Sequence, residues 1–287
     1  PPFEGQMEGS LMYARGVCDD KGPAIAIFYA VKALLDAGVE LNKTIKLIFG
    51  SDEETGMSDM KYYVEHADVP DYAFSPDAEF PVIFAEKHVM GGLYTAKVEG
   101  DTALLSLKGG TAPNAVPGKA TAQISVNQDY KLENTDKVSY GVWGGNKVNI
   151  TATGIPSHAS LPEQGENAIN TLLSELLNKL PDEDSAKPLI KSLYNGMSAS
   201  DGSKLGVACQ DDATGALTLN LGLINLENGV INAVFDIRHP VTLDYKATIA
   251  TLETAIEGFK LAESHCSEGI HRPKDGLLVS TLQSLFR

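Results

Sequence analysis

The stretch Thr44-Ile-Lys-Leu-Ile-Phe-Gly50 is a short, apolar and β-branched run that ends on a glycine. Such a run predicts a buried strand. Before it, Pro23 suits the first turn of a helix, and apolar residues repeat on one side of residues 24–37. After it, the sequence predicts a second helix over residues 57–66 and a second strand over residues 72–75. Strands and helices that alternate at this spacing indicate an α/β fold with a parallel sheet.

The residue pattern of the sequence changes near residue 87, where glycines begin to occur in pairs. A helical pattern resumes near Pro273. Between these points the pattern predicts an α+β region with hairpins. Its strand-like runs lie at 102–108, 119–126, 147–153, 216–224 and 230–238, and its helical patterns lie at 164–180 and 244–261.

Composition excludes several classes of protein. The 287 residues hold 23 Lys and Arg against 38 Asp and Glu, a net charge of −15, which argues against a nucleic-acid partner. No run of eighteen apolar residues occurs, so the sequence predicts no membrane-spanning helix. The cysteines Cys18, Cys209 and Cys266 are too scattered for a disulfide framework, which favours a reducing, cytoplasmic location.

Acidic residues gather in three places of the first region: Asp19-Asp20, Asp52-Glu53-Glu54 and Asp77. Each lies just after a predicted strand or just before a predicted helix, so all three are expected at the carboxyl edge of the sheet, where open α/β folds bind ligands. Several carboxylates in one crevice repel unless cations lie among them, and a pair of divalent metals meets that need. Adjacent Glu53 and Glu54 offer one metal ligand and one general base. The alternative is that these residues are helix caps or solvated loop charges.

Three segments carry a resemblance to a known family. They are Tyr13-Ala-Arg-Gly-Val-Cys-Asp-Asp-Lys-Gly-Pro23, Gly50-Ser-Asp-Glu-Glu-Thr-Gly56 and Phe74-Ser-Pro-Asp-Ala-Glu-Phe-Pro81. Together they closely resemble motifs of the PepV-type bacterial dipeptidases. These belong to the dinuclear-zinc peptidases, which include carnosinase, carboxypeptidase G, aminoacylase and acetylornithine deacetylase. The resemblance covers essentially the whole chain.

The resemblance implies a domain arrangement and a reaction. Residues 1–86 and 269–287 would belong to an α/β catalytic domain, and residues 87–268 would form an inserted α+β lid domain. The implied cofactors are two Zn²⁺ ions, with Mn²⁺ or Co²⁺ as alternatives. Hydroxide bound to zinc would attack a peptide bond of a dipeptide or short peptide that carries a free C-terminal carboxylate.

Residue roles follow from the positions that match the family motifs. Asp19 resembles the carboxylate that bridges both zinc ions. Glu54 resembles a ligand of one zinc and Asp77 a ligand of the other. Glu53 resembles the general base that takes the proton of the attacking water.

Three residues of the lid region match substrate contacts of the family. His158, in Gly154-Ile-Pro-Ser-His-Ala-Ser160, resembles the histidine that stabilises the oxyanion. Arg238, in Asp236-Ile-Arg-His-Pro240, resembles the arginine that binds the substrate carboxylate, a group whose geometry suits a guanidinium. Asn114 resembles a polar substrate contact.

Two histidines that the family uses as zinc ligands have no counterpart in this sequence: one lies upstream of the position of Pro1, the other near the family's C-terminus. Carboxylates alone hold zinc less well than a set that includes imidazole. We therefore expect a fragment that lacks both ends of its parent enzyme and is inactive by itself.

Two other functions stay open at the level of sequence. One is an N-acyl amino-acid deacylase that uses the same dinuclear site, and the other is a non-catalytic binding or assembly module. For the dipeptidase, the expected partner is a small peptide substrate. The length of residues 87–268 favours a monomer over a dimer formed through the lid.

Overall fold

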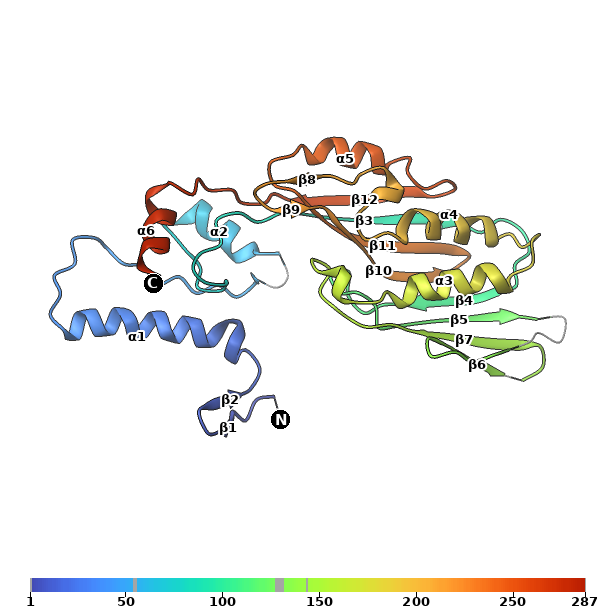
Figure 1. The fold of residues 1–287 in the computed structure, drawn as a ribbon, viewed down its shortest axis with the longest axis horizontal. Helices are drawn as coiled ribbons and strands as arrows, with labels where there is room; N and C mark the ends of the chain where they lie inside the picture. Colours follow the sequence, from blue (N-terminus) through green and yellow to red (C-terminus); the bar gives the residue numbers. More distant parts are fainter. Residues whose placement is uncertain (1, 54–55, 127–131, 143, 287) are drawn as a thin grey trace. The chain divides into compact units, whose positions relative to one another are not determined.

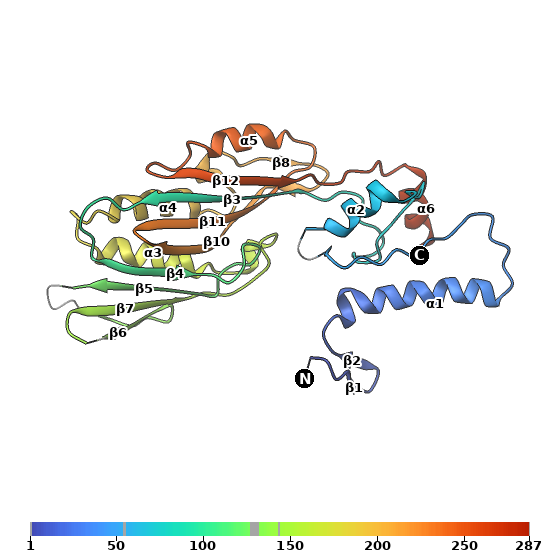
Figure 2. The same ribbon diagram turned by 180° about the vertical axis from the view of Figure 1, so that it is seen from behind.

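The computed structural model describes residues 2–53, 56–126, 132–142 and 144–286. The chain divides into two compact units. Unit 1 comprises Pro1–Ile83 and Pro273–Arg287, and unit 2 comprises Phe84–Arg272. Figures 1 and 2 show the ribbon from opposite sides. In the described part of the chain, no helix is both long and apolar enough to cross a membrane.

Unit 1 combines short helices with long irregular segments. A short antiparallel hairpin of β1 (Gln6–Glu8) and β2 (Leu11–Tyr13) precedes the one-turn segment η1 (Val17–Lys21). Three helices follow along the chain: α1 (Gly22–Asp36), α2 (Ser58–His66) and, from the C-terminal part, α6 (Leu277–Leu285). The helices predicted over 24–37, over 57–66 and after Pro273 are thereby confirmed.

The strands predicted over 44–50 and 72–75 are not formed. Both segments are irregular, and their residues are exposed. A strand is stabilised by a hydrogen-bonded neighbour, and among the described residues no strand pairs with either segment. Every strand pair in the described ranges is antiparallel, so the parallel pairing expected for unit 1 is absent there. The mixed α/β class of the chain is confirmed.

Unit 2 is built on an eight-stranded antiparallel sheet with the order β12-β3-β11-β10-β4-β5-β7-β6 (Figure 1). Strands β8 (Gln210–Asp211) and β9 (Gly215–Ala216) form a separate two-stranded hairpin that precedes β10 in the sequence. The strands of the large sheet are β3 (His88–Lys97), β4 (Leu104–Gly109), β5 (Lys119–Ser125), β6 (Val138–Val142), β7 (Lys147–Thr153), β10 (Thr218–Glu227), β11 (Val230–His239) and β12 (Lys260–Ser267).

Helices α3 (Ala168–Lys179) and α4 (Lys187–Met197) lie side by side along one face of the sheet, in front in Figure 1 and behind in Figure 2. Alternate residues of β5 and β7 are buried beneath α3, as the two-residue period of a strand requires. The core also takes in one side of α3, formed by Ile169, Leu172, Leu173 and Leu176. This layer of apolar side chains makes unit 2 a rigid support for its loops.

The helix predicted over 244–261 is shorter than expected. Helix α5 (Tyr245–Leu252) ends early, and the chain returns as edge strand β12 beside β3. The phenolic oxygen of Tyr94, on β3, donates a hydrogen bond of 2.6 Å to the Leu252 carbonyl oxygen at the end of α5. A buried side chain of the sheet thus fixes the point at which the helix stops.

Candidate functional site

The acidic residues predicted for the metal site lie in loops of unit 1. Asp19 is an exposed residue of η1, just before α1. Glu53 and Asp77 are exposed, and the Asp77 amide donates to Ser75 Oγ at 3.3 Å. Glu54, the fourth acidic residue of the prediction, lies outside the described residues.

The loop that carries Glu53 is closed by two other carboxylates. Asp52 Oδ2 accepts a hydrogen bond of 2.9 Å from the Ser58 amide, at the start of α2. Asp59 Oδ2 accepts from the amides of Ser51 and Asp52, and these backbone donors, led by Ser51, lower the pKa of the Asp59 carboxyl group. Asp52 and Asp59 therefore connect residues 51–52 to the start of α2.

Within residues 2–53, 56–126, 132–142 and 144–286, no group of three or more His, Cys, Asp or Glu side chains could hold a metal ion. Asp20 Oδ1 is buried without a hydrogen-bond partner in the same ranges, but no such group surrounds it. The described carboxylates of unit 1 thus form no metal-binding group among themselves in these ranges. The expected convergence depended on parallel strands at 44–50 and 72–75, which would have brought the loops to one sheet edge.

Unit 2 brings the three predicted substrate contacts together. The Ala159 amide donates to the Asn114 carbonyl oxygen at 2.9 Å, so His158 lies on a segment bonded to that of Asn114. Thr218 Oγ1 donates to the Ala159 carbonyl oxygen at 3.5 Å. Thr218 is in turn the cross-strand neighbour of Arg238. Residues from three distant parts of the sequence thus meet at one end of the β10–β11 pair.

The imidazole of His158 is exposed and held in one orientation by Ser160. The Ser160 amide donates to Nδ1 of His158 at 3.2 Å, and Ser160 Oγ lies 2.6 Å from the same nitrogen. Because Nδ1 accepts from a backbone N–H, the proton of the neutral ring is on Nε2.

Arg238 is held by Asp236, two residues earlier on β11. Nε donates to Oδ1 at 2.9 Å and Nη2 donates to Oδ2 at 3.3 Å. Burial raises the pKa of the Asp236 carboxyl group, against the opposing effects of the Arg238 guanidinium and of His158 and His265. The period of a strand places residues i and i+2 on one side, so the sequence Asp236-Ile-Arg238 could have revealed this pair.

Lys87 is a second cation in this part of unit 2, and no motif of the sequence points to it. Its Nζ donates to the Ala216 carbonyl oxygen. Burial lowers the pKa of the Lys87 ammonium; the positive charge of Arg238 acts in the same direction, and the charges of Asp211 and Glu163 oppose it. The mutual repulsion of Lys87 and Arg238 favours an anion between or beside them.

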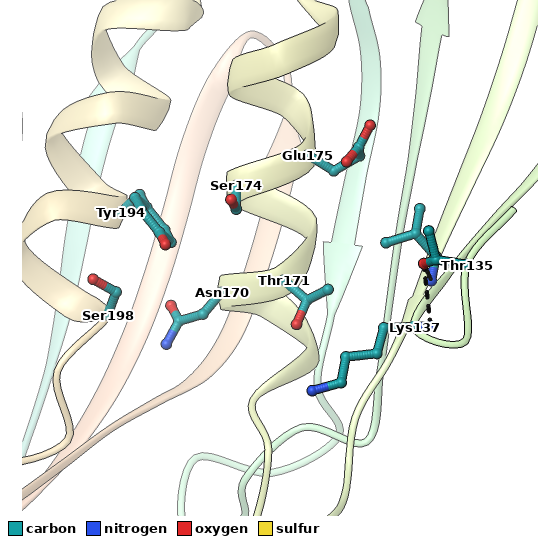
Figure 3. A pocket seen from close by; sticks show the side chains of 9 residues that line it. Thr135, Lys137, Asn170, Thr171, Ser174, Glu175, Tyr194 and Ser198 are labelled. Atoms are coloured by element: carbon teal, nitrogen blue, oxygen red, sulfur yellow. Dashed lines mark hydrogen bonds between the residues drawn. The ribbon is translucent and has the colours of Figure 1, made fainter. Parts of the chain in front are cut away.

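A separate hollow of about 400 Å³ lies over helix α3, between α4 and the segment that leads into β6 (Figure 3). Lys137, Asn170, Glu175 and Tyr194 are among its lining residues. It includes none of the residues predicted for the site. Asn114, His158 and Arg238, the predicted substrate contacts, lie elsewhere in unit 2.

Comparisons with known proteins match the chain to a family model and to similar bacterial proteins. Residues 1–271 match the family model described as Peptidase family M20/M25/M40. A similar relative is "Putative dipeptidase YtjP" of Bacillus subtilis (strain 168), 33% identical over 300 residues, which cover 99% of this chain and 64% of that protein. Another is "Putative dipeptidase SAR1836" of Staphylococcus aureus (strain MRSA252), 29% identical over 307 residues, with 100% and 65% covered.

The chain thus spans about two thirds of the length of these relatives, 64% and 65% respectively. Among solved structures, the aminoacylhistidine dipeptidase from Vibrio alginolyticus gives a TM-score of 0.29 at 12% identity, over 69% of this chain and 47% of that one. A TM-score this low does not establish a shared fold or a shared site.

Proposed function

The chain belongs to peptidase family M20/M25/M40, and from this premise we propose that the full-length protein hydrolyses dipeptides or short peptides with a free C-terminal carboxylate. The observation that carries the proposal is the meeting of Asn114, His158 and Arg238 at one end of β10 and β11. The names of the similar curated relatives, which are those of dipeptidases, support it.

Arg238 binds the carboxylate of the substrate. A guanidinium has five N–H donors in a fixed plane, and among the described residues Asp236 accepts from Nε and Nη2 only. The remaining donors suit a second carboxylate. Lys87 adds positive charge nearby, which draws an anionic group to the same place.

His158 and Asn114 act on the scissile peptide. When water attacks the carbonyl carbon, the carbonyl oxygen gains negative charge, and the Nε2–H of His158 is a donor that can stabilise it. Asn114 contributes an amide beside it. Glu53 takes the proton of the attacking water and delivers it to the leaving nitrogen as the C–N bond breaks.

We assign unit 1 to the catalytic domain and unit 2 to the inserted lid domain. A dinuclear zinc site that includes Asp19, Glu54 and Asp77 stays a prediction from the sequence. Cys18, Cys209 and Cys266 are free thiols, which supports a cytoplasmic protein.

The test is a comparison of substrates with purified full-length protein, with and without added divalent metal. Release of free amino acids from dipeptides, and little release of acid from N-acetyl or N-succinyl amino acids, is expected. The reverse preference would identify a deacylase. Hydrolysis of neither class by a folded protein would favour a non-catalytic module.

A further inference from the structure

We propose that Asn220 is the positioning residue of the substrate site in unit 2, because its side chain holds the loop that carries Asn114 and, through it, the loop that carries His158. This inference rests on the proposed function for its effect on catalysis. Its structural part, that Asn220 orders both loops, can be tested without any activity.

The carboxamide of Asn220 is 2% exposed and bonds on both sides of Asn114. Its Nδ2 donates to the Pro113 carbonyl oxygen at 3.2 Å and to the Ala115 carbonyl oxygen at 2.9 Å. These carbonyl groups belong to the residues immediately before and after Asn114. One side chain therefore fixes the backbone from which the Asn114 side chain projects.

The orientation of this carboxamide is determined by a second amide. Asn220 Oδ1 accepts from Nδ2 of Asn167 at 3.2 Å. Two further hydrogen bonds hold Asn167 in place. Its Oδ1 caps helix α3 by accepting from the Ile169 amide at 2.9 Å. Its Nδ2 also donates to the Leu221 carbonyl oxygen at 2.9 Å. Asn220 thus has both amide hydrogens and its oxygen engaged, and a carboxylate there would face two carbonyl oxygens.

The constraint extends from Asn114 to His158 through the backbone. The Ala159 amide donates to the Asn114 carbonyl oxygen at 2.9 Å, and the Val116 amide donates to the Ser157 carbonyl oxygen at 2.8 Å. These bonds bracket His158. A change in the position of residues 113–115 therefore moves the imidazole as well.

The sheet itself does not hold this loop. Strands β4 and β10 pair only at Gly109 with Ile224 and at Lys108 with Asn225. Beyond them the chain after β4 passes so close to β10 that a Cβ at Gly222 would collide with the backbone of Pro113. The side chain of Asn220 supplies the hydrogen bonds that a strand neighbour would otherwise make.

Asn220 also connects the loop to the arginine. It is the cross-strand partner of Asp236, the residue that holds the Arg238 guanidinium. Arg238 has its own support in Asp236, so loss of the Asn220 amide disturbs His158 and Asn114 while the carboxylate contact persists. The expected kinetic signature is a fall in kcat that exceeds any rise in KM.

The experiment compares Asn220→Asp and Asn220→Ser with the matched control Asn225→Asp, in the full-length protein. Asn225 lies on the same strand, is exposed, and accepts one hydrogen bond from Asn232. Hydrogen exchange is measured at the Val116 and Ala159 amides, with the β11 amide of Ile231 as an internal reference, and kcat and KM are measured with a dipeptide. Asn220→Ser keeps one hydroxyl donor and serves if the carboxylate variant does not fold.

In both Asn220 variants we expect hydrogen exchange at the Val116 and Ala159 amides to rise about tenfold or more, with exchange at Ile231 unchanged. We also expect kcat to fall about tenfold in these variants. Asn225→Asp should show neither change. Unchanged exchange at the two loop amides overturns the proposal. Faster exchange with kcat unchanged, in an enzyme whose wild type is active, also overturns it. If the wild type hydrolyses no peptide, the proposed function fails, and the exchange result alone decides whether Asn220 orders the loops.

Discussion

Arg238 and Asp236 form a partly buried ion pair within one strand: Nε lies 2.9 Å from Oδ1, and the two side chains are 18% and 8% exposed. Because both residues project from β11, the pair forms without bringing separate parts of the chain together. The guanidinium therefore keeps one orientation before any substrate arrives. Such preorganisation lowers the entropic cost of binding a carboxylate.

Removal of one partner tests the ion pair directly. In Asp236→Asn the guanidinium loses its anion while it stays largely buried, so the free energy of unfolding should fall by about 2–3 kcal/mol. Urea unfolding measures the change. The control is Glu99→Gln, which removes the exposed pair of Glu99 with Lys97 and should cost well under about 1 kcal/mol. If the two variants lost equal free energy of unfolding, the Asp236–Arg238 pair would contribute no more to stability than the exposed pair.

Buried His239 predicts a pH dependence of stability. The ring is 1% exposed; Nδ1 lies 3.0 Å from the Pro240 carbonyl oxygen and Nε2 accepts from Thr248 Oγ1 at 3.0 Å, which is the bonding of a neutral imidazole. Burial lowers the pKa of His239 and the charge of His88 adds to this effect, while the hydrogen bond to the Pro240 carbonyl and the charges of Asp211 and Asp244 oppose it.

In the unfolded chain His239 binds its proton near pH 6.5, above its folded pKa. Between the two values the unfolded state binds more protons, so stability is full above about pH 6.5 and falls as the pH drops below it. His239→Gln should flatten the dependence measured by urea unfolding from pH 8 to 5. His66→Gln, which alters an exposed ring stacked on Tyr62, should leave it in place. A wild-type slope that survives in His239→Gln would refute this assignment.

The hydroxyl of Tyr94 is predicted to stabilise the junction of β3 and α5. Tyr94→Phe removes the donor to the Leu252 carbonyl oxygen at a site with 0% exposure. The carbonyl keeps a hydrogen bond of 3.3 Å from the Ala255 amide, so loss of the Tyr94 donor should lower the free energy of unfolding by about 0.5–1.5 kcal/mol. Thermal unfolding of Tyr94→Phe is compared with Tyr29→Phe, an exposed position on α1. No difference between them would show that the bond contributes nothing.

Metal binding by the 287-residue chain is predicted to be weak. The described residues contain no group of three or more metal-ligating side chains, and carboxylates alone bind zinc less well than mixed ligand sets. Calorimetric titration with zinc should show no tight equivalent, and Asp19→Ala should titrate like the wild type. Two tight equivalents that disappear in Asp19→Ala would show instead that the carboxylates suffice.

The helices were predictable from sequence because local signals determine them. Pro23 starts the periodic pattern of α1, and Gly38, with φ of 69°, follows its end. Strands that depend on distant partners were less predictable. The run at 44–50 has the composition of a strand but no described neighbour, whereas β3 was missed because its Gly91-Gly92 pair suggests a turn. Those glycines make room for the rings of His265 and Phe235.

The candidate site was predictable where a motif names a residue and not where tertiary structure gives it a role. Arg238 and His158 were singled out through their motifs, and the structure links the loop of His158 to strand β10, which pairs with β11 at Arg238. Asn220 carries no sequence signal, because an asparagine within a strand is unremarkable until the loop at 113–115 is seen to bond to it. Metal ligation in unit 1 could not be derived, since it depends on the relative positions of several loops.

The central claim is that Arg238 binds the free carboxylate of a peptide that the full-length protein cleaves. The most direct measurement is kcat/KM for a dipeptide and for its C-terminal amide, with wild type and Arg238→Lys. We predict that the wild type favours the carboxylate by about tenfold to a hundredfold, the strength of a charged hydrogen bond, and that Arg238→Lys loses most of this preference. Equal cleavage of carboxylate and amide by the wild type, or a preference that Arg238→Lys leaves intact, would contradict it.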